Sequence, residues 1–314
     1  MRAPARQCRK PGAGLKLTVL SGKMCASALH LPADFEISFR AMTAASDQRP
    51  IGVFDSGVGG LSVLRAIRNE LPFEDVVYVA DSGYAPYGDR PREFIEGRAL
   101  AIVDFLLQRQ VKAVVVACNT ATGAAVHVLR ARLTIPVIAI EPAVKPAALQ
   151  TRSGVVGVLA TTGTLSSPKF LDLVDRHGAG VKVLVQPCPG LAEQVEAGAL
   201  ASDDTRALVE TLVRPLLDKA ADTLVLGCTH YPFVRQLIAD VAGPAVTIID
   251  PATAVARELR RRLEAGGLAA TPSPSATKPE GSEEFWTSGD PTTVGDVIAL
   301  VWGQPVRVRA LPAT

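Results

Sequence analysis

Two stretches of the sequence share one order of features: VVVACNTATGAAV over residues 114–126 and TLVLGCTHYPFV over residues 223–234. Each is an apolar run that ends at a cysteine, Cys118 in the first stretch and Cys228 in the second. Small polar and hydroxylated residues follow each thiol directly. Short apolar runs of this kind are typical of strands that are buried on both faces of a parallel sheet. The sequence therefore predicts two buried strands that each end at a thiol.

Around these stretches the chain alternates between apolar runs and segments with helical spacing. Runs that predict strands lie at 51–54, 76–80, 112–117, 135–140, 154–160, 181–186, 223–227 and 246–249. Segment 61–71 has its aliphatic residues on one helix face, and segment 91–110 begins with a proline that suits a first helical turn. This alternation predicts a doubly wound α/β fold, in which ligands bind at the carboxyl ends of the strands. Both thiols stand at such ends.

Composition limits the classes of function. A chain of 314 residues can form two domains with their own cores. A net charge of +2 gives no electrostatic reason to expect a nucleic-acid or membrane partner, and the longest apolar runs are too short to span a bilayer. The five cysteines have no repeated short spacing, which predicts reduced thiols and a cytoplasmic location rather than a disulfide framework.

Two segments differ from the rest in composition. Residues 1–49 begin with basic residues, proline and glycine, and contain one short apolar run, LTVL. We expect them to be a disordered N-terminal extension, or translation from an upstream start with Met24 or Met42 as the internal alternative. Residues 266–284 are rich in proline, serine, alanine and glycine, and this composition predicts a flexible linker.

A free cysteine such as Cys118 or Cys228, taken alone, is most often a buried structural residue. A catalytic interpretation therefore depends on the two cysteines together. A phosphatase loop needs an arginine six positions after the cysteine, where this chain has Ala124 and Val234. A zinc site is weakly supported, because Cys228 and His230 are only two positions apart. Two thiols that face each other across a carbon atom could remove a proton from one side and deliver one to the other. Only this interpretation explains why the motif occurs twice.

The other strand ends also carry polar residues. Asp55 and Ser56 open a glycine-rich turn, VFDSGVGGLSVL, which could bind an anion or, with the Asp55 carboxylate, a zwitterion. DSGYAPYGDRP and TTGT follow two further strands, and QPCPGLAEQVEAG places Glu193 and Glu196 on one helix face. An ordinary turn, a surface loop and a solvated helix face are the alternative interpretations of these motifs. Cys188, between two prolines, is interpreted as structural.

Taken together, these motifs resemble those of the glutamate racemases in the aspartate/glutamate racemase superfamily. The resemblance covers about Pro50 to Leu311 and rests on IGVFDSGVGGLSVL, YAPYGDRP, ACNTAT, EPAVKPA, TTGT, GCTHYP and FWTSGDP. It implies two doubly wound α/β domains of similar topology, related by a pseudo-twofold axis, with the active site in the cleft between them. Residues 50–141 with 251–314 would form the first domain, and residues 142–250 the second.

The same resemblance implies roles for individual residues. Cys118 and Cys228 would be the two acid/base groups, with Cys228 acting on L-glutamate and Cys118 on D-glutamate. Asp55, His230 and Glu196 would assist proton transfer. The substrate contacts that match the family pattern are Asp55, Ser56, Tyr87, Gly88, Asn119, Thr120, Thr161, Thr164, Thr229 and His230.

The activity implied by the resemblance is cofactor-independent and metal-independent interconversion of L- and D-glutamate, which supplies D-glutamate for peptidoglycan. Glutamate is the expected partner, with no nucleic acid and no membrane, and a homodimer is allowed for. Two alternatives stay open at this point. The chain could be an aspartate or hydantoin racemase of the same fold, or a racemase-like binding protein that inhibits a partner such as DNA gyrase.

Overall fold

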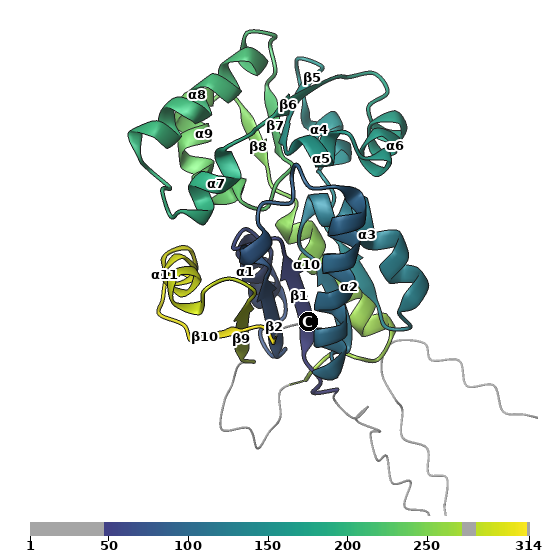
Figure 1. The fold of residues 1–314 in the computed structure, drawn as a ribbon. Coiled ribbons are helices and arrows are strands. Elements are labelled where there is room, and N and C mark those ends of the chain that lie inside the picture. Colours follow the sequence, from purple (N-terminus) through teal and green to yellow (C-terminus); the bar gives the residue numbers. More distant parts are fainter. Residues whose placement is uncertain (1–46, 272–280, 313–314) are drawn as a thin grey trace, which may run out of the picture. The chain divides into compact units, whose positions relative to one another are not determined.

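A computed structural model describes residues 47–271 and 281–312, and over these ranges the strands form two sheets (Figure 1). The larger sheet has six strands in the order β10–β9–β2–β1–β3–β4, and the smaller has four in the order β6–β5–β7–β8. All neighbouring strands run parallel. The strands are β1 (Ile51–Asp55), β2 (Val76–Ala80), β3 (Ala113–Val116), β4 (Val137–Ala139), β5 (Val155–Ala160), β6 (Lys182–Pro187), β7 (Thr223–Leu226), β8 (Thr247–Ile249), β9 (Glu283–Thr287) and β10 (Val308–Ala310).

Helices connect the strands throughout the described chain. They are α1 (Leu61–Glu70), α2 (Arg92–Gln108), α3 (Asn119–Arg132), α4 (Val144–Gln150), α5 (Thr162–Leu165), α6 (Pro168–His177), α7 (Leu191–Glu196), α8 (Asp203–Leu217), α9 (Arg235–Ala242), α10 (Ala252–Ala265) and α11 (Pro291–Trp302), with short 3-10 helices η1 (Ser82–Tyr84) and η2 (Tyr231–Val234). All eight predicted strands are present, and the two predicted helices are α1 and α2. The α/β fold with parallel sheets is thus confirmed, whereas β9 and β10 are strands that the sequence analysis did not predict.

The core explains why the strands are apolar throughout. In β1, Ile51 and Val53 belong to a hydrophobic cluster that includes Leu64 of α1, whereas Phe54 belongs to a second cluster with Ile102 of α2. Alternate residues of one strand point to opposite faces of a sheet, so both faces of β1 are covered. A strand in that position cannot carry polar side chains until it ends, which places the polar residues at the strand ends.

The carboxyl ends of the parallel strands collect the reactive residues. Asp55 is the last residue of β1, Asp81 directly follows β2, and Cys118 follows β3 by two positions. In the four-stranded sheet, Thr161 directly follows β5 and Cys228 follows β7 by two positions. Because parallel strands end at the same edge of their sheet, each sheet brings its polar residues together at one edge.

The opposite end of the six-stranded sheet contains a buried ion pair. Lys112, directly before β3, has a fully buried side chain, and its Nζ lies 2.5 Å from Oε2 of the buried Glu74. Lys112 Nζ also donates to the carbonyl of Asp47 at 2.5 Å, and the main-chain N–H of Ala270 donates to Glu74 Oε1 at 2.8 Å. The pair therefore fixes two peripheral segments of the chain to the core.

Of the two segments of unusual composition, residues 1–46 of the first and 272–280 of the second lie outside the described residues. The contact between Asp47 and Lys112 shows that the last residues of the predicted extension pack on the core. The predicted linker also extends too far, because Glu283 and Glu284 belong to β9 and pair with β2. The sequence did not predict this strand because it begins with two charged residues. In the structure, Glu283 Oε1 accepts a hydrogen bond from Arg68 Nε at 2.5 Å.

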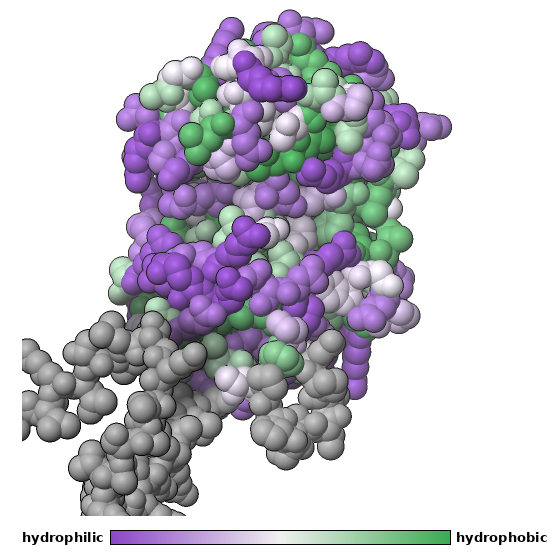
Figure 2. All heavy atoms as spheres, turned by 180° about the vertical axis from the view of Figure 1, so that it is seen from behind, coloured by the Kyte–Doolittle hydropathy of each residue, from purple (hydrophilic) through white to green (hydrophobic). Residues whose placement is uncertain are grey.

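Figure 2 shows hydrophilic residues over much of one face of the molecule, with hydrophobic groups between them. Over residues 47–271 and 281–312, the helices are all too short or too polar to cross a membrane.

Candidate active site

The turn after β1 is built around a buried carboxylate. Asp55 is fully buried, and its Oδ2 accepts the main-chain N–H groups of Gly60 at 2.8 Å and Gly57 at 3.4 Å. A Cβ atom at Gly57 would overlap the Glu196 carboxylate, and one at Gly59 would overlap the His230 ring. The glycines of this turn therefore allow two residues from the far part of the chain to approach β1.

Cys118 occupies the N-cap position of α3. Its Sγ accepts the main-chain N–H of Ala121 at 3.4 Å and lies 3.7 Å from Ser56 Oγ. Burial raises the pKa of the Cys118 thiol well above its ordinary value, and the Asp55 carboxylate raises it further. The Ala121 N–H and Ser56 hydroxyl act in the opposite direction, and a charge on Cys228 adds to the increase. The Cys118 thiol is thus held in its protonated form.

Cys228 has a different partner. Its Sγ lies 3.6 Å from His230 Nδ1, and His230 Nε2 lies 2.6 Å from Glu196 Oε1. Burial disfavours a charged His230, but the hydrogen bonds to Cys228 and Glu196 outweigh burial and raise the pKa of His230 well above its usual value. His230 thus lies between the Cys228 thiol and the Glu196 carboxylate, in contact with both.

Glu196 also contacts the turn after β1 and the loop after β2. Its Oε1 accepts the main-chain N–H of Val58 at 2.7 Å, and its Oε2 accepts from Ser82 Oγ at 3.3 Å. A solvated helix face was the alternative interpretation of this position, and the structure instead gives the carboxylate contacts with Val58, Ser82 and His230. Glu196 therefore connects residues that follow strands of the six-stranded sheet to His230 beside Cys228.

Two further contacts connect the end of β1 and the start of α1 to Thr229, which follows β7. Thr229 Oγ1 donates to Asp55 Oδ1 at 3.3 Å, and Ser62 Oγ donates to the Thr229 carbonyl at 3.0 Å. Burial raises the pKa of Asp55 to about 6, although His230 and the Gly60 N–H oppose this increase. An acid with this pKa can change its protonation state near neutral pH.

Three predicted substrate contacts form a cluster of hydroxyl groups. Thr120 Oγ1 lies 2.9 Å from Thr161 Oγ1 and 3.3 Å from Thr164 Oγ1, and Thr161 Oγ1 donates to Thr164 Oγ1 at 2.9 Å. Thr120 lies in the first turn of α3, Thr161 is the N-cap of α5, and Thr164 lies within α5. The cluster again joins the ends of strands from the two sheets.

Gly88 and Asn119 lie beside this cluster. The carbonyl of Gly88 accepts the N–H of Gly163 at 2.9 Å, and a Cβ atom at Gly88 would lie 3.1 Å from Thr161 Cβ. Asn119 is 5% exposed, and among the described residues neither its amide nitrogen nor its amide oxygen has a hydrogen-bond partner. A buried amide without protein partners is a strong candidate for contact with a polar ligand.

Tyr87, a predicted substrate contact, has a buried partner of its own. Its side chain is buried, and its hydroxyl donates to Asp81 Oδ2. Burial and the Asp81 charge raise the pKa of Tyr87 well above its usual value, so the phenol stays protonated. The Tyr87 hydroxyl therefore has a partner within the protein, and the substrate contacts predicted for Tyr87 and Gly88 stay predictions.

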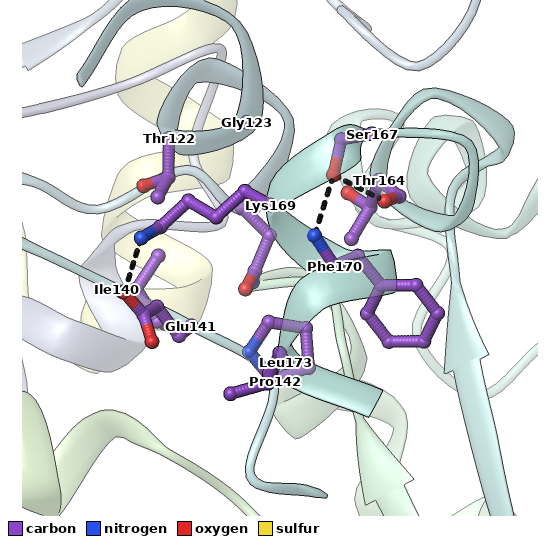
Figure 3. Close-up of a pocket in the computed structure, with 11 residues that line it drawn as sticks. Thr122, Gly123, Ile140, Glu141, Pro142, Thr164, Ser167, Lys169, Phe170 and Leu173 are labelled. Carbon is purple, nitrogen blue, oxygen red and sulfur yellow. Dashed lines mark hydrogen bonds and ion pairs between the residues drawn. The ribbon is translucent and has the colours of Figure 1, made fainter. Parts of the chain in front are cut away.

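A pocket next to Asn119 opens at the beginning of α6 (Figure 3). Thr122 and Gly123 of α3 form one wall, and Thr164, Ser167 and the first turn of α6 form the other. At the rim, Lys169 Nζ reaches Glu141 Oε1 at 2.6 Å. Because Asn119 and Thr164 also line this pocket, it borders the cluster of predicted substrate contacts.

Several participating residues were not singled out from the sequence. Ser62 and Tyr78 contact the site, and the Tyr78 hydroxyl donates to the Gly57 carbonyl at 2.8 Å. Asp81 also belongs to the site, because it accepts the Tyr87 hydroxyl. Its position directly after β2 is the one sequence feature that could have identified it as a site residue. In the ranges that the structure describes, His, Cys, Asp and Glu side chains form no group of three or more that could hold a metal ion.

Comparison with known proteins adds an independent observation. The family model of Asp/Glu/Hydantoin racemase matches residues 51–259. The chain is 57% identical over 267 residues to a glutamate racemase of Methylococcus capsulatus, covering 85% of this chain and 97% of the relative.

Solved structures agree with the sequence comparison. A glutamate racemase isoform from Bacillus anthracis is 35% identical with a TM-score of 0.76, covering 85% of this chain and 98% of that one. A glutamate racemase from Francisella tularensis, solved in complex with D-glutamate, is 29% identical with a TM-score of 0.72 over the same shares. The chain therefore belongs to the Asp/Glu/hydantoin racemase family, as an amino-acid racemase of its glutamate racemase branch.

Proposed function

We propose that the chain interconverts L- and D-glutamate by two-base proton transfer at the α-carbon, with Cys118 and Cys228 as the two bases. The observation that carries this proposal is the pair of strand-end thiols, each with its own acid/base neighbour. Asp55 interacts with Cys118, and His230 lies 3.6 Å from Cys228. One thiol comes from each sheet, as expected when the two faces of one carbon atom need equivalent groups.

The surroundings of the thiols suggest their resting protonation states. Burial stabilises Cys118 as the thiol, and His230, whose Nδ1 lies 3.6 Å from Cys228 Sγ, is the group that takes up the Cys228 proton. In this state Cys228 removes the α-proton of L-glutamate, and Cys118 delivers a proton to the opposite face, forming D-glutamate. The enzyme then holds a Cys118 thiolate and a Cys228 thiol, which is the state that accepts D-glutamate.

Return to the first state requires proton exchange near the thiols. Asp55, with a pKa raised to about 6 by burial, can exchange a proton near neutral pH beside Cys118. Glu196 holds His230 in line with Cys228 through the 2.6 Å contact to Nε2. We assign Asp55, His230 and Glu196 as the residues that set the protonation of the two thiols.

Stabilisation of the carbanion is assigned to donors at the strand ends. An α-carbanion carries its charge into the adjacent carboxylate, so donors aimed at that group lower the barrier. The main-chain N–H groups that begin α3, the hydroxyls of Thr120 and Thr229, and the Asn119 amide are the candidates. Their burial excludes water, which strengthens each of these interactions. Ser56, Gly88, Thr161 and Thr164 complete the proposed substrate contacts.

We also propose the arrangement that places this site between two domains. Residues 50–141 with 251–314 would form one domain around the six-stranded sheet, and residues 142–250 the other around the four-stranded sheet. Cys118 then comes from the first domain and Cys228 from the second. Supply of D-glutamate for peptidoglycan in the cytoplasm is the biological role that accords with this activity.

The activity is tested by circular dichroism of L-glutamate solutions incubated with the full chain and no added cofactor. We expect the optical signal to decay to that of the racemate, and aspartate, glutamine and alanine to be converted hardly at all. A site whose buried polar groups are left unpaired by the wrong substrate discriminates by about 10⁴-fold. Conversion of aspartate at a comparable rate would favour the alternative racemase, and unchanged L-glutamate would refute the proposal.

A further inference from the structure

A buried ion pair between Asp81 and helix α2 anchors the loop after β2. Asp81 is fully buried, and Arg98 of α2 donates to both of its oxygens, from Nε at 2.9 Å and from Nη2 at 2.6 Å. Tyr87, six residues further along the loop, donates its hydroxyl to the same carboxylate. Two-point contacts between a guanidinium and a carboxylate fix orientation as well as distance. Asp81 thus joins helix α2 to the far end of the loop.

Arg98 contacts the loop at a second point. Its guanidinium carbon lies 3.9 Å from the centre of the Tyr84 ring, in η1. The Arg98 side chain is only 14% exposed, whereas the Tyr84 ring lies at the surface. Planar guanidinium groups stack on aromatic rings in this way, whereas an ammonium group cannot reproduce both the stacking and the two-point contact.

The other end of the loop reaches the proposed substrate contacts. Tyr87 is 1% exposed, and the next residue, Gly88, accepts from the Gly163 N–H at 2.9 Å. A continuous series of contacts therefore runs from Arg98 through Asp81 and Tyr87 to the main chain of Gly88.

We propose that Arg98 is a positioning residue for racemisation: acting through Asp81 and Tyr87, it holds the main chain at Gly88 in the place where the substrate binds. The inference rests on the proposed function, because it takes glutamate as the molecule that this loop contacts. Arg98 itself touches no reacting atom. Its loss should weaken substrate binding more than it slows proton transfer, because the two thiols are held by other elements.

The test compares Arg98→Met with Arg92→Met in the full chain. Arg92 is a matched control, since it lies on the same helix and pairs with Glu96 at 2.7 Å, but its side chain is 53% exposed. We expect Arg98→Met to raise the KM for glutamate by about tenfold or more, because small displacements of a binding group have large effects. The value of kcat should stay within about threefold, as expected when binding is lost equally in the ground and transition states. Arg92→Met should change neither.

Two more variants test whether the contacts act in series. Tyr87→Phe removes only the hydroxyl that donates to Asp81. Arg98→Lys keeps the positive charge but loses the two-point contact of the guanidinium with Asp81. Tyr87→Phe should raise KM, Arg98→Lys should give an intermediate KM, and combining Tyr87→Phe with Arg98→Met should add little to the larger single effect. These two milder variants carry the test if Arg98→Met does not fold by far-ultraviolet circular dichroism.

A KM for Arg98→Met equal to that of Arg92→Met would overturn the proposal. Independent, multiplying effects of Arg98→Met and Tyr87→Phe would also overturn it, because contacts in series cannot act independently. Failure of the proposed function itself is distinguishable, since the unmodified chain would then leave L-glutamate unchanged.

Discussion

Replacing either Cys118 or Cys228 with alanine is expected to lower the rate of racemisation by about 10³-fold or more, in both directions. In the proposed mechanism each thiol is needed in each direction, once as the base and once as the acid, so neither variant should retain a one-way activity. Both side chains are buried and small, and alanine fits the space of each. Initial rates measured from L- and D-glutamate by circular dichroism check this expectation.

A substrate that needs only one thiol separates the two roles. From a 3-chlorinated glutamate, removal of the α-proton expels chloride, and the resulting enamine hydrolyses to 2-oxoglutarate and ammonia without reprotonation by the second thiol. We expect Cys118→Ala to retain elimination from the L-enantiomer, because Cys228 is intact. Cys228→Ala should retain elimination from the D-enantiomer.

Cys188→Ala is the matched control for these variants. Cys188 is also buried, but its Sγ donates to the Gln186 carbonyl at 3.2 Å and has no assigned role. Its replacement should leave both racemisation and elimination close to the unmodified rates. Loss of elimination from both enantiomers in both catalytic variants would contradict the division of labour between the thiols.

Lys112→Met is expected to lower the free energy of unfolding by about 3–5 kcal/mol, the usual effect of leaving one partner of a buried ion pair without its counter-charge. The Lys112 side chain is fully buried, and its removal leaves the Glu74 carboxylate, itself 2% exposed, without a cation. It also removes the donor to the Asp47 carbonyl. Urea-induced unfolding followed by far-ultraviolet circular dichroism measures the change.

Two comparisons make this second prediction specific. Arg176→Met removes an exposed pair with Asp172 on α6, and pairs of that kind contribute at most about 1 kcal/mol. Adding Glu74→Gln to Lys112→Met should recover a large part of the lost stability, because the unpaired buried charge is then gone. If Lys112→Met were no more destabilising than Arg176→Met, the buried pair would not hold the core as argued.

Most of the fold was predictable because the eight predicted strands consist largely of apolar residues. Strands such as β1 and β7 are buried on both faces, so periodicity and composition agreed on them. Strands β9 and β10 were missed because the first begins with two glutamates and the second includes Arg309. Their charged side chains find partners far away in sequence, such as Arg68 for Glu283, and no local pattern records such partners.

The site was predictable to the extent that its residues follow strands. Cys118, Cys228 and Asp55 stand at strand ends and were found on that ground, whereas the roles of the other predicted residues came from the family resemblance. The contact of Glu196 with the Val58 N–H joins positions 138 residues apart, and the sequence alone favoured a solvated face for it. Arg98 lies within a helix whose pattern gives it no special character, so only the fold brings it to Asp81.

The measurement that tests the two-thiol account most directly is racemisation of L-glutamate in deuterated water, followed by mass spectrometry of the separated enantiomers at early times. With one thiol on each face of the α-carbon, the removed proton stays on Cys228 while Cys118 delivers deuterium from solvent. The account predicts that the D-glutamate first formed carries deuterium at the α-carbon and that the remaining L-glutamate carries almost none. Heavy early labelling of L-glutamate would show that a single base serves both faces, and would contradict the account.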